Sequence, residues 1–181
     1  MQHPHPPIWV AARAPITYDY AVKHGYDIMS WPLTRPFSEA ELYKERLDDA
    51  MAANPDAKRP TFAMMRHSAV YAKSEDWNKP VQALQRTLGQ FENLFKNLGD
   101  VVNGFPKQIP LDELENRDEY NADMLRENLM FGTPEEVINK LKRYEALGVD
   151  AFIYYASMNL DMASQKQSLK LFCDEVMPAF S

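Results

Sequence analysis

Apolar positions along the chain follow two patterns, short continuous runs and longer segments with helical spacing. The runs predict strands within residues 8–12 (IWVAA), 26–31 (YDIMSW), 59–72 (RPTFAMMRHSAVYA) and 149–156 (VDAFIYYA). Each run is followed by a segment whose apolar residues recur every three or four positions, which predicts a helix. Strands and helices that alternate in this way favour parallel strands with right-handed crossovers. The predicted fold class is therefore α/β, with about four parallel strands.

Local signals predict where several helices begin. Ser38 with Glu41 three residues later is typical of a capping box, in which the two side chains satisfy free amides at the helix start. Thr133 before Pro134 is typical of an N-cap followed by proline in the first helical position. The closing helix is predicted to start near Asp161. Together these signals place helices at 38–54, 134–147 and from 161 onward.

Residues 99–132 interrupt the alternation of strands and helices. This segment is rich in proline, glycine and acidic residues and is only partly periodic, which predicts an excursion with one or two short helices. Long excursions in compact domains are either functional lids or solvated connectors. The chain, residues 1–181, is predicted to be a single domain that carries this excursion.

Composition excludes several classes of partner. The formal net charge of −6, without a clustered Lys/Arg stripe, argues against nucleic acid, and no apolar run is long enough to cross a membrane. Cys173 has no second cysteine for a disulfide, which predicts a cytoplasmic protein, and it is predicted to lie in the core beside Phe172. His3 and His5 make a poor metal site in a proline-rich terminus, so no metal is expected.

Three stretches resemble the luciferase-like flavin-dependent monooxygenases, the family of bacterial luciferase. In chain order they are PPIWVAARAPITYDYAVKHGYDIMSW, MFGTPEEVINKLKRYEALGVDAFIYY and QSLKLFCDEVMPAF. The resemblance implies the second half of a TIM (β/α)8 barrel. The strand at residues 8–12 is then the fifth barrel strand, and the first four strands are not part of this chain.

The resemblance also implies an activity. Members of the family use reduced flavin and O₂ to oxidise an apolar organic substrate, with FMN as the flavin and a flavin reductase to supply it in reduced form. A related branch uses a deazaflavin. Because the family's catalytic groups lie largely on the early strands, the chain is expected to be incomplete on its own. The alternatives are a non-catalytic flavin-binding or vestigial half-barrel that acts through dimerisation, and a small α/β interaction module without flavin.

The turn after the first strand is the predicted cofactor site. A strand that leads through a short turn into a helix directs backbone amides and the positive end of the helix dipole toward one point, which suits an anion. The resemblance places the FMN phosphate there, at Ala12, Arg13, Ala14 and Thr17. Arg13 either binds the phosphate with its guanidinium or is an ordinary exposed arginine. Thr17 is a phosphate contact, the helix N-cap, or both.

Other candidate residues lie near the ends of the later strands. Trp31 and Tyr155 are candidates for a flavin or substrate pocket, because a barrel's active face lies at the carboxyl ends of its strands. Arg66 and His67 are consecutive on one strand and point to opposite faces. Arg66 is a further pocket candidate, and His67 is a weak candidate for catalysis.

Half a barrel leaves apolar surface without cover. Four parallel strands taken from a closed barrel have two open edges and one bare face, along which IWVAA and FIYYA lie. This surface predicts a homodimer, which we favour because it needs no other protein, a separate chain that supplies the missing half-barrel, or a fragment that repacks by domain exchange.

Overall fold

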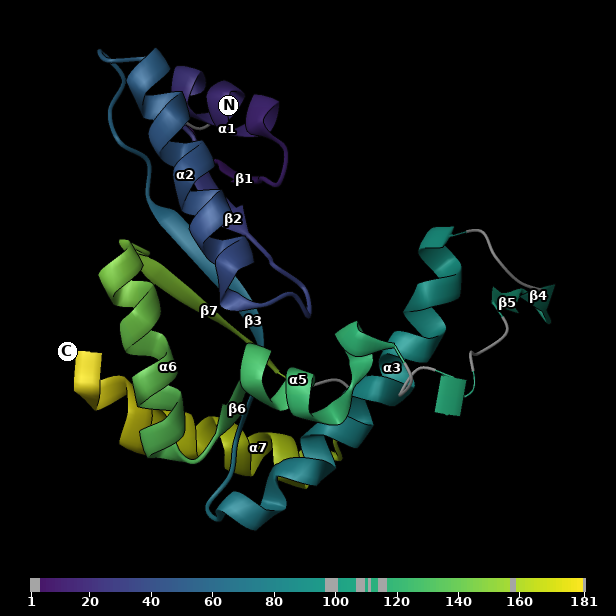
Figure 1. Ribbon diagram of the computed structural model, residues 1–181. Helices are drawn as coiled ribbons and strands as arrows, with labels where there is room; N and C mark the ends of the chain where they lie inside the picture. The colour runs from purple at the N-terminus through teal and green to yellow at the C-terminus, as the bar shows by residue number, and fades with distance from the viewer. Residues whose placement is uncertain are drawn as a thin grey trace. The chain divides into compact units, whose positions relative to one another are not determined.

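The computed structural model describes residues 4–96, 101–106, 110, 112–113, 117–156 and 159–180 (Figure 1). The chain divides into two compact units, Met1–Arg66 with Leu141–Tyr155, and His67–Lys140 with Ala156–Ser181. The boundaries therefore fall inside two strands, β3 (Phe62–Val70) and β7 (Ala151–Ala156), and inside one helix, α6 (Pro134–Leu147). The single domain expected for the whole chain stays a prediction. Within the described ranges, no helix is both long and apolar enough to cross a bilayer.

The first unit contains the predicted parallel strands. These are β1 (Trp9–Ala11), β2 (Asp27–Ser30), the first part of β3, and β7 (Ala151–Ala156). β1 pairs with β2 and β2 with β3, both in parallel, and β7 pairs with β3. The register places Val10 opposite Ile28 and Ile28 opposite Phe62. The α/β fold class with parallel strands is thus confirmed.

Two helices of the first unit lie side by side, α1 (Pro15–His24) and α2 (Phe37–Ala53) (Figure 1). α1 ends at Gly25, which adopts a left-handed conformation with φ 67°, as the sequence predicts. The N-cap of α1 is Ala14 and not Thr17. The helix begins earlier because Pro15 has the φ that a first helical residue needs, which leaves Thr17 inside the first turn.

The start of α2 also differs from the prediction. Its N-cap is Pro36, without a side-chain hydrogen bond, so the capping box expected from Ser38 is wrong. Packing explains the difference: the ring of Phe37 meets the ring of Tyr144 edge-on, with centroids 5.0 Å apart. This contact favours a helix that includes Phe37, and Ser38 then lies one residue inside it.

The core of the first unit is made of side chains that are almost completely shielded from solvent: Tyr18, Ala21, Val22, Ile28, Ala40, Tyr43, Leu47, Phe62 and Met64. They come from α1, α2, β2 and β3. Burial of each large apolar side chain stabilises the fold by about 1.5–3 kcal/mol before the cost of ordering it.

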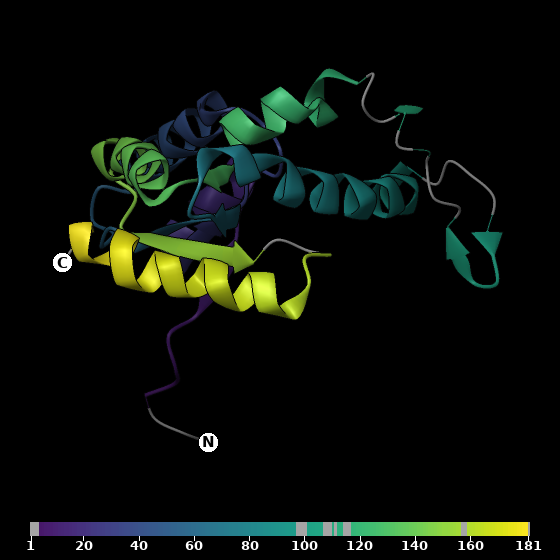
Figure 2. The same ribbon diagram turned by 90° about the horizontal axis from the view of Figure 1, so that it is seen from below.

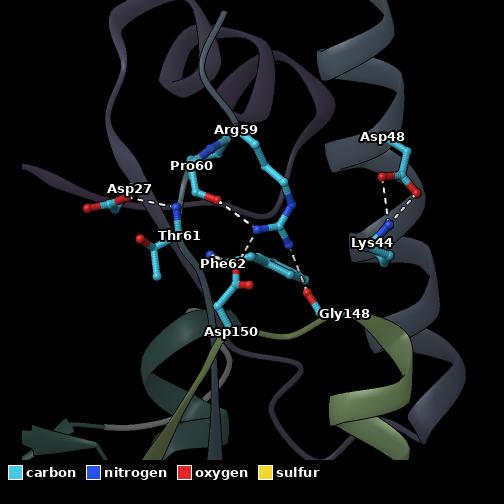
Figure 3. Close-up of polar contacts among 9 residues, drawn as sticks. All are labelled: Asp27, Lys44, Asp48, Arg59, Pro60, Thr61, Phe62, Gly148 and Asp150. Carbon is cyan, nitrogen blue, oxygen red and sulfur yellow. Dashed lines mark hydrogen bonds and ion pairs between the residues drawn. The ribbon is translucent and has the colours of Figure 1, made fainter.

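Carboxylates hold the amino end of β3 (Figure 3). Asp150 Oδ2 accepts hydrogen bonds from the Phe62 amide at 2.8 Å and from Arg59 Nη1 at 2.7 Å. Asp27 Oδ1 accepts from the Thr61 amide at 2.8 Å. The strand amides at this end are therefore satisfied by side chains. In parallel barrels this end serves stability, whereas chemistry takes place at the carboxyl ends.

The second unit consists mainly of helices. They are η1 (Ser74–Trp77), α3 (Asn78–Lys96), η2 (Asp118–Tyr120), α5 (Ala122–Asn128), the first part of α6 (Pro134–Leu147), α7 (Met162–Leu171), η3 (Phe172–Val176) and η4 (Met177–Phe180). α3 and α5 lie next to each other in both views (Figures 1 and 2). The buried cluster of this unit comprises Ala69, Tyr71, Val81, Ala83, Leu84, Leu125, Leu129, Phe131 and Leu160.

The excursion contains short strands that the sequence does not predict. Within 99–132, α5 fulfils the expectation of a short helix, and β4 (Val101–Val102) pairs antiparallel with β5 (Phe105–Pro106). β6 (Met130–Gly132) pairs in parallel with the last residues of β3, Ser68–Val70. Three residues are too few for a recognisable pattern, and only the pairing with β3 makes them a strand.

Two further expectations have opposite outcomes. The cap at Thr133 is confirmed: its amide donates to Glu136 Oε2 at 2.8 Å, and its hydroxyl accepts from the Glu136 amide at 3.4 Å. Cys173, predicted to be buried, is exposed. The buried residues of the π-helical turn η3 are Phe172 and Val176, four positions apart on one face, and Cys173 lies off that face.

Asp161 caps α7, as the sequence predicts. Its carboxylate accepts from the Ser164 amide at 2.9 Å and hydroxyl at 2.7 Å, and it lies 3.1 Å from Lys79 Nζ. These hydrogen bonds, with that of the Ser164 amide foremost, hold the pKa of Asp161 well below its usual range. The contribution to stability is therefore present above the ordinary pKa of 3.8 and is lost as the pH falls below it.

We expect Asp161→Asn to lower the melting temperature at pH 7, because asparagine keeps the cap but removes the charge. The difference from the unsubstituted chain shrinks as the pH falls below about 4, since Asp161 of the unfolded chain is then progressively protonated while that of the folded chain is not. Thermal unfolding followed by circular dichroism at several pH values measures it. An equal difference at pH 7 and at pH 2 would show that the charge has no part in the effect.

Candidate functional site

The turn between β1 and α1 brings the predicted phosphate residues together. Ala12 is buried, whereas Arg13 and Ala14 are exposed and Thr17 is partly exposed. The Thr17 amide donates to the Ala14 carbonyl at 2.9 Å, and Pro15 has no amide hydrogen. The amides of Ala14 and Ile16 are then the ones that the first turn of α1 offers to a ligand.

Buried hydroxyl groups hold the backbone of this turn. Ser30 Oγ donates to the Ala12 carbonyl at 3.0 Å, and the Tyr18 hydroxyl lies 2.6 Å from Ser30 Oγ. Burial raises the pKa of Tyr18 far above its usual range, so its hydroxyl stays protonated. The position of Ala12 therefore depends on side chains of α1 and β2. Nothing in the local sequence indicates the part played by Tyr18, because its spacing is that of any core residue.

The side chain and the carbonyl of Arg13 both contact α2. Arg13 Nε donates to the Tyr43 hydroxyl at 3.1 Å, and Arg46 Nη1 donates to the Arg13 carbonyl. The Arg46 guanidinium also lies 5.6 Å from the centroid of the Tyr43 ring. Two cations thus lie at the turn, Arg13 within it and Arg46 from α2. Sequence reasoning missed Arg46 because an arginine on the polar face of a helix is ordinary, and only the packing of α2 on α1 brings it to Arg13.

Two pocket candidates from different strands meet in the first unit. Trp31 follows directly after β2, and Tyr155 lies near the carboxyl end of β7. Their rings are T-shaped, with centroids 5.4 Å apart and planes at 87°. Both side chains are only partly buried. Since Trp31 is next to Ser30, which bonds to the Ala12 carbonyl, the aromatic pair and the turn are linked through β2.

Arg66 is completely buried and bonded to the protein. Its Nε donates to the Tyr144 hydroxyl at 2.8 Å, and its Nη1 donates to the carbonyls of Leu33 and Arg35 at 3.1 and 2.8 Å. These carbonyls belong to the loop after β2, in which Leu33 has a φ of 56°. The contacts favour a role in holding this loop. A contact between Arg66 and a ligand stays a prediction.

The histidines add little to the site. His67 is 2% exposed and belongs to the second unit, and its catalytic role stays a prediction. His5 Nδ1 lies 2.8 Å from the Pro6 carbonyl, while His3 is outside the described residues. In the part of the chain that the structure describes, no three His, Cys, Asp or Glu side chains gather as metal ligands.

The second unit has a pocket of about 220 Å³ at the end of β3. It is lined by Ala69, Val70, Tyr71, Ala72, Asp76, Lys79, Pro80, Leu160, Ser164, Gln167 and Ser168. Lys79 pairs with Asp161 beside it. None of the residues that the sequence singled out for flavin or substrate lines this pocket, so the candidate site remains in the first unit.

The family follows from a match over most of the chain. Residues 1–151 match the luciferase-like monooxygenase family. The chain belongs to this family. The resemblance that the sequence indicated is thereby confirmed. A curated relative from Acinetobacter baylyi, the oxygenase component of a flavin-dependent trigonelline monooxygenase, is 32% identical over 181 residues. The alignment covers all of this luciferase-like chain but only 50% of that relative.

Solved structures show the same fold and the same partial coverage. Monooxygenase RslO1 from Streptomyces bottropensis has a TM-score of 0.62 at 20% identity, with 99% of this chain and 50% of that chain covered. The oxygenating constituent of 3,6-diketocamphane monooxygenase from Pseudomonas putida, in complex with FMN, has a TM-score of 0.66 at 16% identity, with 96% and 49% covered. The luciferase-like chain therefore has the fold of about half of these proteins.

Proposed function

We propose that the chain forms part of the active site of an FMN-dependent monooxygenase and binds the FMN phosphate at the turn Ala12–Thr17. Reduced flavin supplies the electrons for the reaction of O₂ with an organic substrate. The residues of this chain bind the cofactor, orient it and exclude water. The observation that carries the proposal is the exposed turn between β1 and α1, with the Arg13 guanidinium beside it.

The donors at this turn suit a phosphate. They comprise the Arg13 guanidinium, the Thr17 hydroxyl and the amides of Ala14 and Ile16, all at the positive end of α1. The small side chain of Ala14 lets an anion approach the backbone. The buried hydroxyls of Ser30 and Tyr18 keep the turn in place before a ligand binds, which reduces the cost of ordering it on binding.

The aromatic pair supplies an apolar surface for a ring. Trp31 and Tyr155 are partly exposed. Trp31 follows β2 and Tyr155 lies in β7, at the ends where parallel barrels carry out chemistry. We assign this pair to the flavin ring or the substrate. The curated relative is named for trigonelline, so trigonelline is the first substrate to test. A deazaflavin is the alternative cofactor.

A second half-barrel completes the proposed site. Along the edge strand β1, Trp9 is 47% exposed and Ile8, just before it, 38%, and the residues of β7 from Ala151 to Tyr155 are only partly buried. Since the family members that the chain matches are about twice as long, we propose that another chain, or a second copy, covers these strands. A flavin reductase then supplies reduced FMN, and the single cysteine suits the cytoplasm.

Titration of the full chain with FMN, followed by flavin fluorescence, tests the proposal. We expect Arg13→Ala to weaken FMN binding about tenfold, or about 1.4 kcal/mol, because a charge-assisted bond to phosphate is lost. Lys23→Ala is the matched control, since Lys23 is a cation in the last turn of α1, at the far end from the proposed site, and pairs with Asp19. Equal affinities of the three proteins would contradict a phosphate site at the turn.

Activity measurements distinguish the proposed monooxygenase from the non-catalytic flavin-binding alternative. The chain is mixed with NADH, a flavin reductase, FMN and trigonelline, and O₂ consumption above the reductase background is measured, together with loss of trigonelline. Substrate-dependent O₂ consumption supports the monooxygenase. FMN binding without turnover supports the non-catalytic flavin-binding half-barrel.

A further inference from the structure

We infer that Arg46 is a positioning residue that makes the Ala12–Thr17 turn selective for a phosphate monoester, and hence for FMN over flavins without one. The inference rests on the proposed function and extends it, because it assigns the choice among flavins to a residue outside the turn. Arg46 lies on α2, far from the turn in sequence.

The geometry links Arg46, Tyr43 and Arg13. Arg46 donates to the Arg13 carbonyl, and its guanidinium faces the Tyr43 ring at 5.6 Å. The Tyr43 hydroxyl in turn accepts from Arg13 Nε at 3.1 Å. α2 therefore holds Arg13 at two points, its carbonyl and its Nε. Among the described residues Nε is the guanidinium atom of Arg13 that bonds to the protein, so both Nη groups are oriented by the protein and available to a ligand.

The position of Tyr43 makes this arrangement rigid. Its side chain is completely buried, and burial raises the pKa of its hydroxyl, which therefore stays neutral at physiological pH. A neutral hydroxyl accepts from Arg13 Nε without cancelling the arginine charge. A guanidinium held through Nε presents its two Nη groups side by side, the arrangement that binds two phosphate oxygens at once.

The charges at the turn match a dianion. The first turn of α1 has no acidic residue, and Glu39 is the carboxylate that acts on Tyr43. Arg13 and Arg46 both contact Tyr43, so two positive charges accompany the Glu39 carboxylate there. A phosphate monoester carries a charge of about −1.5 to −2 at pH 7. In FAD the two phosphates form a pyrophosphate, in which each bears a single negative charge, and riboflavin has no phosphate. Attraction to two guanidinium groups thus favours FMN over riboflavin.

The ratio of the dissociation constants for riboflavin and FMN tests the inference. Fluorescence titrations of the full chain compare the unsubstituted protein, Arg46→Ala and Arg46→Lys. We expect Arg46→Ala to lower the ratio about tenfold, with riboflavin affinity unchanged, because positioned charge acts only on the phosphate. Arg46→Lys restores part of the ratio, since lysine keeps the charge but not the planar fork. Loss of affinity for both flavins alike would show a merely structural role.

Lys44→Ala is the matched control. Lys44 lies two residues earlier on α2, and its ammonium is paired with Asp48 at 2.6 Å. Its removal is expected to leave the ratio unchanged. If Arg46→Ala keeps the ratio of the unsubstituted protein, the inference is overturned and the phosphate site stands. If the unsubstituted chain binds FMN no more tightly than riboflavin, or binds neither, the phosphate site itself is overturned, and the role of Arg46 with it.

Discussion

Arg66→Met is expected to destabilise the chain by about 3–5 kcal/mol, because it leaves several buried acceptors without donors. Arg66 is completely buried and donates to the Tyr144 hydroxyl and to the carbonyls of Leu33 and Arg35. Methionine has a similar length but no hydrogen-bond donor. The loop after β2, which the arginine holds, would have to find water or rearrange. Urea denaturation followed by circular dichroism measures the change.

Arg59→Met is the matched control, with the same substitution at an exposed site. The side chain of Arg59 is 46% exposed and pairs with Asp150, so its loss is expected to cost about 1 kcal/mol or less. Similar midpoints for Arg66→Met and Arg59→Met would mean that the buried contacts contribute far less than their geometry indicates. A further comparison of flavin affinity in Arg66→Met tests the predicted ligand contact separately from stability.

Gly132→Ala is the second substitution with a large expected effect, about 2–4 kcal/mol, from overpacking and loss of a helix cap. A Cβ at Gly132 would lie 2.7 Å from the Cβ of Glu136 and 3.1 Å from its Oε2. Glu136 is the residue whose carboxylate accepts from the Thr133 amide at the start of α6. The added methyl group therefore collides with the helix and displaces the cap. Residue 132, in the MFGTPEEV stretch, is therefore a glycine because a larger side chain would collide with Glu136.

A double-mutant cycle isolates the collision. Glu136→Gly removes the Cβ that the new methyl group meets. By itself it is expected to cost about 1 kcal/mol for a glycine within a helix, and it also removes the cap formed by the Glu136 carboxylate. Gly132→Ala should then cost clearly less in the Glu136→Gly background than alone. Strictly additive unfolding free energies would show that the clash with Glu136 is not the cause.

Much of the fold can be predicted from local sequence patterns. The strands β1, β2, β3 and β7 coincide with apolar runs, and the helix boundaries at Gly25, Thr133 and Asp161 coincide with residues whose own chemistry favours a boundary. These features depend on neighbours within a few positions, so that a short stretch carries the whole signal. The start of α2 does not, because the contact between Phe37 and Tyr144 joins residues far apart in the chain.

The candidate site likewise has local features that the sequence predicts and long-range contacts that it does not. A strand, a short turn with Arg13, and a helix opened by Pro15 are local features, and they predict an anion site without any knowledge of the neighbours. That Arg46 reaches the Arg13 carbonyl, and that Trp31 meets Tyr155, are not predictable from spacing. The exposure of Cys173 is another example, because a π-helical turn changes which side chains face the core.

The sequence by itself determined the parallel α/β class, because periodicity and capping chemistry act over a few residues. Its resemblance to known proteins indicated the family and the turn that we propose for the phosphate. Only the tertiary structure decided which distant side chains meet at that turn, the role of Arg66, and the pairing of β6 with β3. The reason is physical: a side chain's partner is set by how helices and strands pack, and packing depends on all the surfaces that are buried together.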